Sequence, residues 1–152
     1  MTAQLYSDTE KACVGMIQDL PESVQQGVFG VGVDIASIDR MKLAIERSGE
    51  GFLNRVYTEK EVEYCRAAER PFERFAACWA AKEAAVKALG TGFRYSISFK
   101  DIELESDGEN RPTLNLTGKF KDLMDEKEIN FSTVSISHEE SKSIAIVMLC
   151  RV

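Results

Sequence analysis

Histidine is nearly absent from this chain, and its cysteines are not spaced like metal ligands. The 152 residues include one histidine, His138, which excludes a site made of several histidines of one chain. The four cysteines form no C-x-x-C pair and no zinc-binding pattern, so we expect reduced thiols and a cytoplasmic protein. They are Cys13, Cys65, Cys78 and Cys150. Any divalent metal would depend mostly on carboxylates, which favours magnesium over zinc.

Basic charge and long apolar runs are also scarce. The 19 Lys and Arg residues are outnumbered by 25 Asp and Glu residues, and the net charge of −6 excludes a generic nucleic-acid binder. The longest apolar runs, such as 144–150, are far shorter than the ~20 residues of a membrane span. The N-terminal residues lack the basic start and apolar core of a signal peptide. We therefore expect no membrane partner and no export.

Length and composition predict one folded domain. The chain has the length of a single domain, and 44% of its residues are apolar, which is enough for a core. Three prolines and ten glycines argue against a disordered chain. Residues 1–27 stand apart as an N-terminal extension of unknown role, and 28–152 form the expected domain.

Hydrophobic periodicity predicts an α+β fold. Expected strands are 28–36, 98–105, 113–116, 131–137 and 143–150. Expected helices are 11–20, 37–49, 58–68, 72–89 and 119–129, with a further turn at 22–26. Strand 28–36 is apolar and rich in glycine, which is consistent with a buried strand. The resulting domain has a mainly antiparallel sheet packed against a long central helix.

The helix 72–89 is apolar on all sides over most of its length. Its segment 75–89 has three charged residues, Lys82, Glu83 and Lys87, and a helix of this kind is normally buried. Glu83 and Lys87 lie one turn apart and share a face. They could form an ordinary salt bridge, or Glu83 could be held for a metal, because a buried carboxylate is costly unless it is paired.

Asp34 lies within the apolar strand, where an aspartate is uncommon without a partner. It could cap the helix that follows, or it could be a magnesium ligand together with Glu83. Magnesium typically takes one or two protein carboxylates and completes its shell with water and substrate phosphates. Two carboxylates from different elements and a lysine are therefore a plausible diphosphate site.

Two weaker signals follow. Gly90-Thr91-Gly92 comes directly after the long helix, where it predicts a C-terminal cap and a turn whose N–H groups could approach phosphate oxygens. His138 ends an expected strand and could be a surface turn residue, a phosphate donor or an acid–base group.

Several segments in order resemble a known signature. Gly32-Val33-Asp34 is followed, after 44 residues, by the segment 79–87, WAAKEAAVK. Downstream come 88–92 (ALGTG), 99–103 (FKDIE) and 135–138 (SISH). Together these motifs resemble the phosphopantetheinyl transferases, and within them the short class of holo-acyl-carrier-protein synthases. The resemblance covers about residues 28–152.

The resemblance implies an activity and a set of roles. Enzymes of this family transfer the phosphopantetheine arm of coenzyme A to a serine of an apo acyl carrier protein, for fatty acid biosynthesis, and release adenosine 3′,5′-bisphosphate. Asp34 and Glu83 are implied as ligands of Mg²⁺, with Lys87 beside the phosphates. His138 is implied in contact with the coenzyme, which Gly90, Thr91 and Gly92 border. The serine proton could be removed by Glu83, Lys87 or a metal-bound water.

The sequence departs from the family at two places. Cys78 occupies a position where the family often has a basic residue, and Arg74, one helical turn earlier, is the candidate substitute. Residues 1–27 have no counterpart in the short class. The carrier is acidic in this family, as is this chain, so docking needs a local basic surface. Arg40 is the first candidate for that surface and Arg47 the second, although both could belong to an ordinary solvated helix face.

The resemblance also implies an assembly. Long members of the family carry two related units with the site between them, whereas this chain has room for one. We therefore expect a homotrimer in which His138 of one subunit completes the site of Asp34 and Glu83 of its neighbour. The alternatives are transfer to a polyketide or peptide synthase carrier, and a catalytically silent binding subunit.

Overall fold

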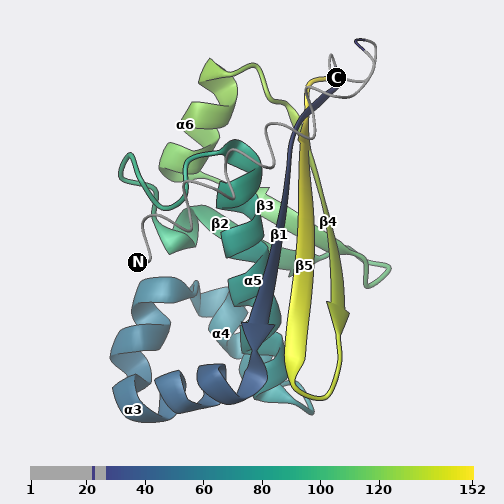
Figure 1. Ribbon diagram of the computed structural model, residues 1–152. Helices are drawn as coiled ribbons and strands as arrows, with labels where there is room; N and C mark the ends of the chain where they lie inside the picture. Colours follow the sequence, from purple (N-terminus) through teal and green to yellow (C-terminus); the bar gives the residue numbers. More distant parts are fainter. Residues whose placement is uncertain (1–21, 23–26) are drawn as a thin grey trace.

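The computed structural model describes residue 22 and residues 27–152 (Figure 1). The helices are α3 (Ile38–Val56), α4 (Glu59–Arg66), α5 (Pro71–Leu89) and α6 (Gly118–Glu126), with a 3-10 helix, η1, at Phe99–Asp101. The strands are β1 (Val28–Ser37), β2 (Ile102–Ser106), β3 (Pro112–Leu116), β4 (Phe131–His138) and β5 (Lys142–Cys150). The helix expected over 11–20 lies outside the described residues, as does most of the turn at 22–26.

An antiparallel sheet packed against one long helix forms the centre of the domain, as the sequence predicts. The strand order is β1-β5-β4, and α5 runs beside β1 and β5 (Figure 1). Gly30 and Gly32 lie where β1 approaches α5, and a Cβ on either glycine would overlap backbone atoms of Ala88 or Ala84. The missing side chains therefore allow the helix to lie directly on the strand. Strands β2 and β3 form a separate two-stranded sheet.

Helix α5 is buried along most of its length, and many of its buried residues are alanines, which let neighbouring elements pack close to it. Pro71 stands at its first turn, and Gly90 ends it in the left-handed conformation, with φ of 79°. Among the described residues, no helix is long and apolar enough to cross a membrane. The amphipathic helices α3 and α6 each bury one face against this centre.

Two expected elements differ from the structure. The helix predicted to end at Gly49 kinks there, with φ of 53°, and continues to Val56, because Leu53 and Val56 bury their side chains in the core. The strand predicted over 98–105 starts instead at Ile102, after η1. Ser98 and Asp101 form a capping box around η1, which alternating hydrophobicity does not reveal.

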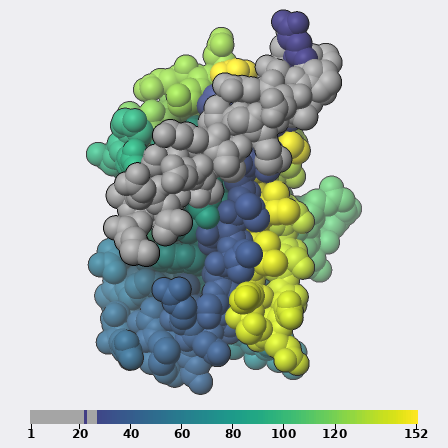
Figure 2. All heavy atoms as spheres, in the orientation of Figure 1, coloured from purple at the N-terminus to yellow at the C-terminus, as the bar shows by residue number. Residues whose placement is uncertain are grey.

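The third difference concerns the outer face of the sheet. Strand β1 is not buried on both faces: the side chains of Val33 and Ile35 are 46% and 59% exposed. Ile146 of β5 lies opposite Val33 and is 47% exposed. The surfaces of β1 and β5 are side by side in Figure 2. The apolar pattern was predicted correctly, but no described element of the same chain covers this outer face.

A buried ion pair connects α4, α5 and the start of β2. Lys82 and Glu61 are 0% and 1% exposed, and Lys82 Nζ lies 2.8 Å from Glu61 Oε2. Lys82 also donates to the carbonyls of Phe99, at 3.0 Å, and Ile102. Glu61 closes the predicted capping box of α4 and accepts from the Leu104 N–H at 3.0 Å. The pair therefore fixes three elements to one another.

Candidate active site

Asp34 and Lys87 meet between β1 and α5. Alternation along β1 puts Asp34 on the same face as Gly30 and Gly32, toward the helix. Lys87 Nζ donates to Asp34 Oδ1 at 2.8 Å and to the Val33 carbonyl at 3.1 Å. Burial raises the pKa of Asp34, although the hydrogen bond and the charge of Lys87 act in the opposite direction. The carboxylate is thus partly desolvated and stabilised by a cation.

Glu83 lies one helical turn before Lys87 and is 7% exposed. The structure therefore brings the sequence-predicted carboxylates and lysine to one boundary between strand and helix. A hard dication fits this donor chemistry, because Mg²⁺ accepts few protein carboxylates and takes its other ligands from water and phosphate. Among the described residues, no group of three or more His, Cys, Asp or Glu side chains could hold a metal.

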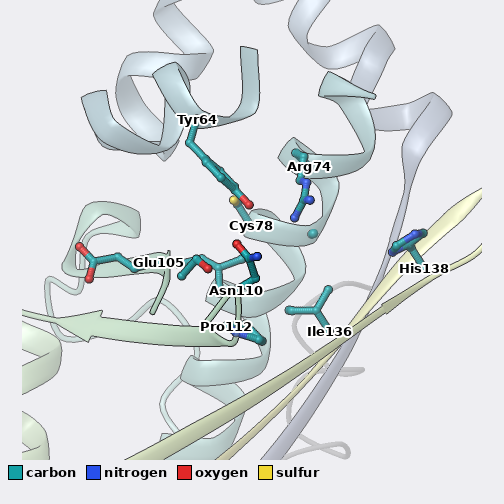
Figure 3. Close-up of a pocket in the computed structure, with 11 residues that line it drawn as sticks. Tyr64, Arg74, Cys78, Glu105, Asn110, Pro112, Ile136 and His138 are labelled. Carbon is teal, nitrogen blue, oxygen red and sulfur yellow. The ribbon is translucent and has the colours of Figure 1, made fainter. Parts of the chain in front are cut away.

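A pocket lies between the β2–β3 hairpin, α4, α5 and β4 (Figure 3). Arg74 points into it from α5, and its guanidinium lies 5.3 Å from the ring centroid of Tyr64. Ile136 and His138 line the side formed by β4. Two predicted coenzyme residues, Arg74 and His138, therefore share one pocket.

Cys78 also lines this pocket and is 1% exposed, as expected for a buried thiol. Its Sγ lies 3.7 Å from Cys65 Sγ, and this hydrogen bond, together with burial, raises the pKa of Cys78. The thiol therefore stays neutral where the family often has a positive charge. Arg74, one turn earlier, supplies a cation to the same pocket.

The two groups of predicted site residues are separated within one chain. Asp34 is on β1 and His138 on β4, the two edges of the three-stranded sheet, with β5 between them. Both side chains are on the face of the sheet that packs against α5, but the two strands that carry them are two strand spacings apart, which is roughly 10 Å. Asp34, Glu83 and Lys87 are not among the described residues that line the pocket of His138. The structure therefore assembles each group and does not join them in a single chain.

The loop after α5 uses its backbone donors internally. The N–H groups of Gly90, Thr91 and Gly92 all lie 3.1 to 3.3 Å from the Val86 carbonyl, and the Thr91 hydroxyl donates to the Gly92 carbonyl. These N–H groups cap the helix and do not point away from it toward a ligand. That this loop lies beside the coenzyme stays a prediction. Its N–H groups are already hydrogen-bonded within the loop, so they do not offer the phosphate contacts that the sequence suggested.

The predicted basic residues are exposed on α3. Arg40 lines a shallow pocket near Asp34, together with Ile35, Met41, Phe52 and Trp79 among others. Arg47 lies two turns further along the helix and is exposed. Neither arginine forms an ion pair with another described residue. Both are therefore available to a negatively charged partner.

Some lining residues had no signal in the sequence. Tyr64, Asn110 and Pro112 line the pocket with Arg74, but they come from α4 and the β2–β3 hairpin. Glu73 was also missed; its carboxylate lies beside His138. Only the chain's folding brings these residues together, so motif spacing could not have found them.

Comparison with known proteins identifies the family of the chain. A family model described as the 4′-phosphopantetheinyl transferase superfamily matches residues 30–147. The holo-[acyl-carrier-protein] synthase of Halothermothrix orenii is 44% identical over 121 residues, which cover 80% of this chain and 96% of that protein. Solved structures are also similar. The holo-[acyl-carrier-protein] synthase of Neisseria meningitidis has a TM-score of 0.75 at 31% identity, covering 80% of this chain and 98% of that one.

The corresponding enzyme of Helicobacter pylori, solved in complex with coenzyme A, has a TM-score of 0.70 at 33% identity over 78% of this chain and 98% of that chain. The family model covers all of α3, α4, α5 and α6 and most of the sheet. The chain therefore belongs to the 4′-phosphopantetheinyl transferase superfamily.

Proposed function

We propose that this protein transfers the 4′-phosphopantetheine arm of coenzyme A to a serine of an apo acyl carrier protein, with adenosine 3′,5′-bisphosphate as the second product. The observation that carries the proposal is the contact of Asp34 with Lys87, with Glu83 one turn away on the same buried helix. The relatives named above are holo-[acyl-carrier-protein] synthases, and one of them holds coenzyme A. Both findings support coenzyme A as the donor.

Catalysis of this transfer depends on position and charge. A phosphoryl group that moves between two oxygens needs alignment and neutralisation of its negative charge more than covalent help from the protein. Lys87 supplies a cation beside the site, and the serine proton would go to Glu83, to Lys87 in its neutral form, or to a water held with the metal. Asp34 and Glu83 would hold Mg²⁺, which when bound supplies neutralisation of the diphosphate and orientation of the attacking group.

The pocket around Arg74 would hold the nucleotide part of coenzyme A. Arg74 offers a guanidinium to a phosphate, while Tyr64 offers an aromatic face. His138 supplies a second nitrogen donor on the opposite wall. The pocket thus combines a cation with apolar walls, which suits a phosphorylated nucleoside.

The carrier would dock on α3. Arg40 and Arg47 are exposed there, and Arg40 is six residues after Asp34. An acidic carrier bound at this helix would bring its serine toward the carboxylates. The apolar pocket beside Arg40 offers it a further contact. The cytoplasmic location expected from the sequence stays a prediction, which cell fractionation tests.

The active form would be a homotrimer with sites between subunits. The exposed apolar face of β1 and β5 needs cover, and a second copy of the chain is its proposed occupant. Since Asp34 and His138 lie at opposite edges of the sheet, subunits arranged head to tail can bring the two groups together.

One reaction tests the function. Purified protein is incubated with coenzyme A, magnesium chloride and apo acyl carrier protein, and the carrier is weighed by mass spectrometry. We expect the carrier to gain one phosphopantetheine group only when all components are present. Transfer to a peptide or polyketide synthase carrier alone would favour the alternative acceptor. No transfer to any carrier would identify a silent binding subunit.

A further inference from the structure

Glu73 is a buried carboxylate that the proposed function does not use. It lies in the first turn of α5, where the helix dipole favours negative charge. Its side chain is 11% exposed, and its Oε1 lies 3.4 Å from His138 Nε2. Its Oε2 is buried and, among the described residues, has no hydrogen bond beyond an ion-pair contact of 2.8 Å with Arg70 Nη1. The carboxylate therefore connects two cationic or titratable groups.

The position of Glu73 relative to His138 is fixed by the backbone. Ser143 is fully buried, and its hydroxyl donates to the Glu73 carbonyl at 3.2 Å. Ser143 is also the residue of β5 that pairs with His138 of β4. The first turn of α5 is therefore tied to the strand pair at the level of the histidine. This attachment places the backbone of Glu73 next to that of His138.

The contact decides which ring nitrogen is left for a ligand. Glu73 engages Nε2, so Nδ1 is the atom available to a molecule in the pocket. A neutral ring protonated at Nε2 offers only an acceptor at Nδ1, whereas a doubly protonated ring donates to the carboxylate and to a phosphate oxygen at once. A carboxylate in this place orients the imidazole.

We propose that Glu73 is a positioning residue, which holds His138 by Nε2 and directs Nδ1 toward a phosphate of the coenzyme. This inference rests on the proposed function, since it takes coenzyme A as the ligand of the pocket. Glu73 touches neither substrate nor reacting atoms. It acts through the histidine, in the way that a carboxylate behind a ligating histidine fixes its orientation.

The test compares Glu73→Gln with Arg70→Gln. Arg70→Gln removes the other partner of the same carboxylate and leaves the histidine contact, which makes it the matched control. His138 is the single histidine of the chain, so its imidazole nitrogen signals in ¹⁵N NMR need no assignment. Calorimetry with coenzyme A gives the dissociation constant, and steady-state transfer gives KM and kcat.

We expect Glu73→Gln to change the imidazole ¹⁵N signals without coenzyme and to weaken coenzyme A binding about tenfold. KM for coenzyme A should rise while kcat changes much less. Arg70→Gln should keep the wild-type signals and affinity. If Glu73→Gln does not fold, Glu73→Asp replaces it, because this variant keeps the charge and moves it one methylene away from His138. It should change the imidazole signals and the coenzyme A affinity in the same direction but by less.

Wild-type imidazole signals in Glu73→Gln, or altered signals with unchanged coenzyme affinity, would overturn the positioning role. Equal losses in Glu73→Gln and Arg70→Gln would also overturn it, since they would indicate a general effect on the start of α5. A wild-type protein that does not bind coenzyme A would instead contradict the proposed function. The signals measured without coenzyme would still decide the Glu73–His138 contact.

Discussion

At the scale of single residues, Asp34 shows how the fold prepares a carboxylate for a cation. Burial raises the pKa of Asp34, and Lys87 opposes that rise by donating to Oδ1. A divalent ion at the same carboxylate would favour its ionised form more strongly than one lysine does. The partly buried Asp34 carboxylate is therefore stabilised by a nearby cation even when no substrate is bound.

Asp34→Ala and Glu83→Ala should each lower transfer at least about 100-fold, because each removes a charge that organises the transferring group. Both variants should still fold, since neither side chain fills the apolar core. Steady-state transfer at several magnesium concentrations measures the effect. Asp39→Ala, an exposed acidic residue of the first turn of α3, is the control and should stay near wild type. Near-wild-type turnover of both site variants at saturating magnesium would disprove the metal assignment.

The predictability of site residues depended on their place in the sequence. Asp34, Glu83 and Lys87 belong to short motifs, and a charged side chain within an apolar segment predicts a functional role for each of them. Tyr64 belongs to no short motif, and it reaches the pocket only because α4 packs beside α5. Glu73 comes to lie beside His138 only because the start of α5 meets the end of β4. The spacing of residues along one helix is visible in a sequence, whereas contacts between elements are not.

At the scale of elements, the contact of β1 with α5 determines whether the site forms. Gly32→Ala should destabilise the protein by about 1–3 kcal/mol or more, because the new Cβ would overlap the Ala84 carbonyl and lie 2.6 Å from the Ala88 nitrogen. Urea unfolding measures this loss. Gly108→Ala adds a Cβ that meets nothing within 4 Å and should have little effect. Equal stability of the two variants would show that α5 can move away from β1 at little cost.

The buried pair of Lys82 and Glu61 should behave as one unit. Lys82→Met leaves the Glu61 carboxylate buried without its cation and should cost about 3–5 kcal/mol in free energy of unfolding. Adding Glu61→Gln removes the unpaired charge and should recover part of that loss. The two single variants and the double variant, unfolded in urea, give the coupling energy. A double variant whose loss equals the sum of the single losses would show that the pair is not coupled.

Most elements were predicted from periodicity and caps, and the differences have local causes. The capping box of α4 and the left-handed Gly90 follow from residue types at fixed positions, and both predictions are confirmed. Gly49 predicts a helix end, because glycine often ends helices, but in the structure α3 kinks there and continues. The apolar residues after it belong to the same helix and pack into the core.

The exposed face of α3 should bind the carrier mainly through charge. Arg40→Glu should weaken carrier binding far more than coenzyme A binding, since Arg40 lies outside the pocket of Arg74. The effect should shrink with added salt, because exposed charges are screened within ~10 Å at 0.1 M ionic strength. Binding of each ligand at two salt concentrations measures this difference. Equal losses for carrier and coenzyme would instead assign Arg40 to the coenzyme site.

At the scale of the whole molecule, the three-stranded sheet has one face covered by α5 and one that is partly open. Apolar side chains of β1 and β5 line the open face, while β4 contributes exposed Ser135 and Ser137 to it. A monomer that exposes such a face is uncommon unless it marks an interface. The sequence predicted the assembly only through the family resemblance, because an apolar strand looks the same whether its own chain or another one covers it.

A shared site makes a strong prediction about mixed assemblies. Glu83→Ala and His138→Ala should each inactivate their own trimer, because each removes one of the two groups that meet at every site. When the two variants are dissociated together and reassembled, some contacts pair an intact Glu83 with an intact His138 of the neighbouring subunit. Those sites should recover part of the activity, which transfer assays measure after mass spectrometry has verified mixing. Light scattering that gives a monomer, or mixed trimers without recovery, would show that each chain has a complete site of its own.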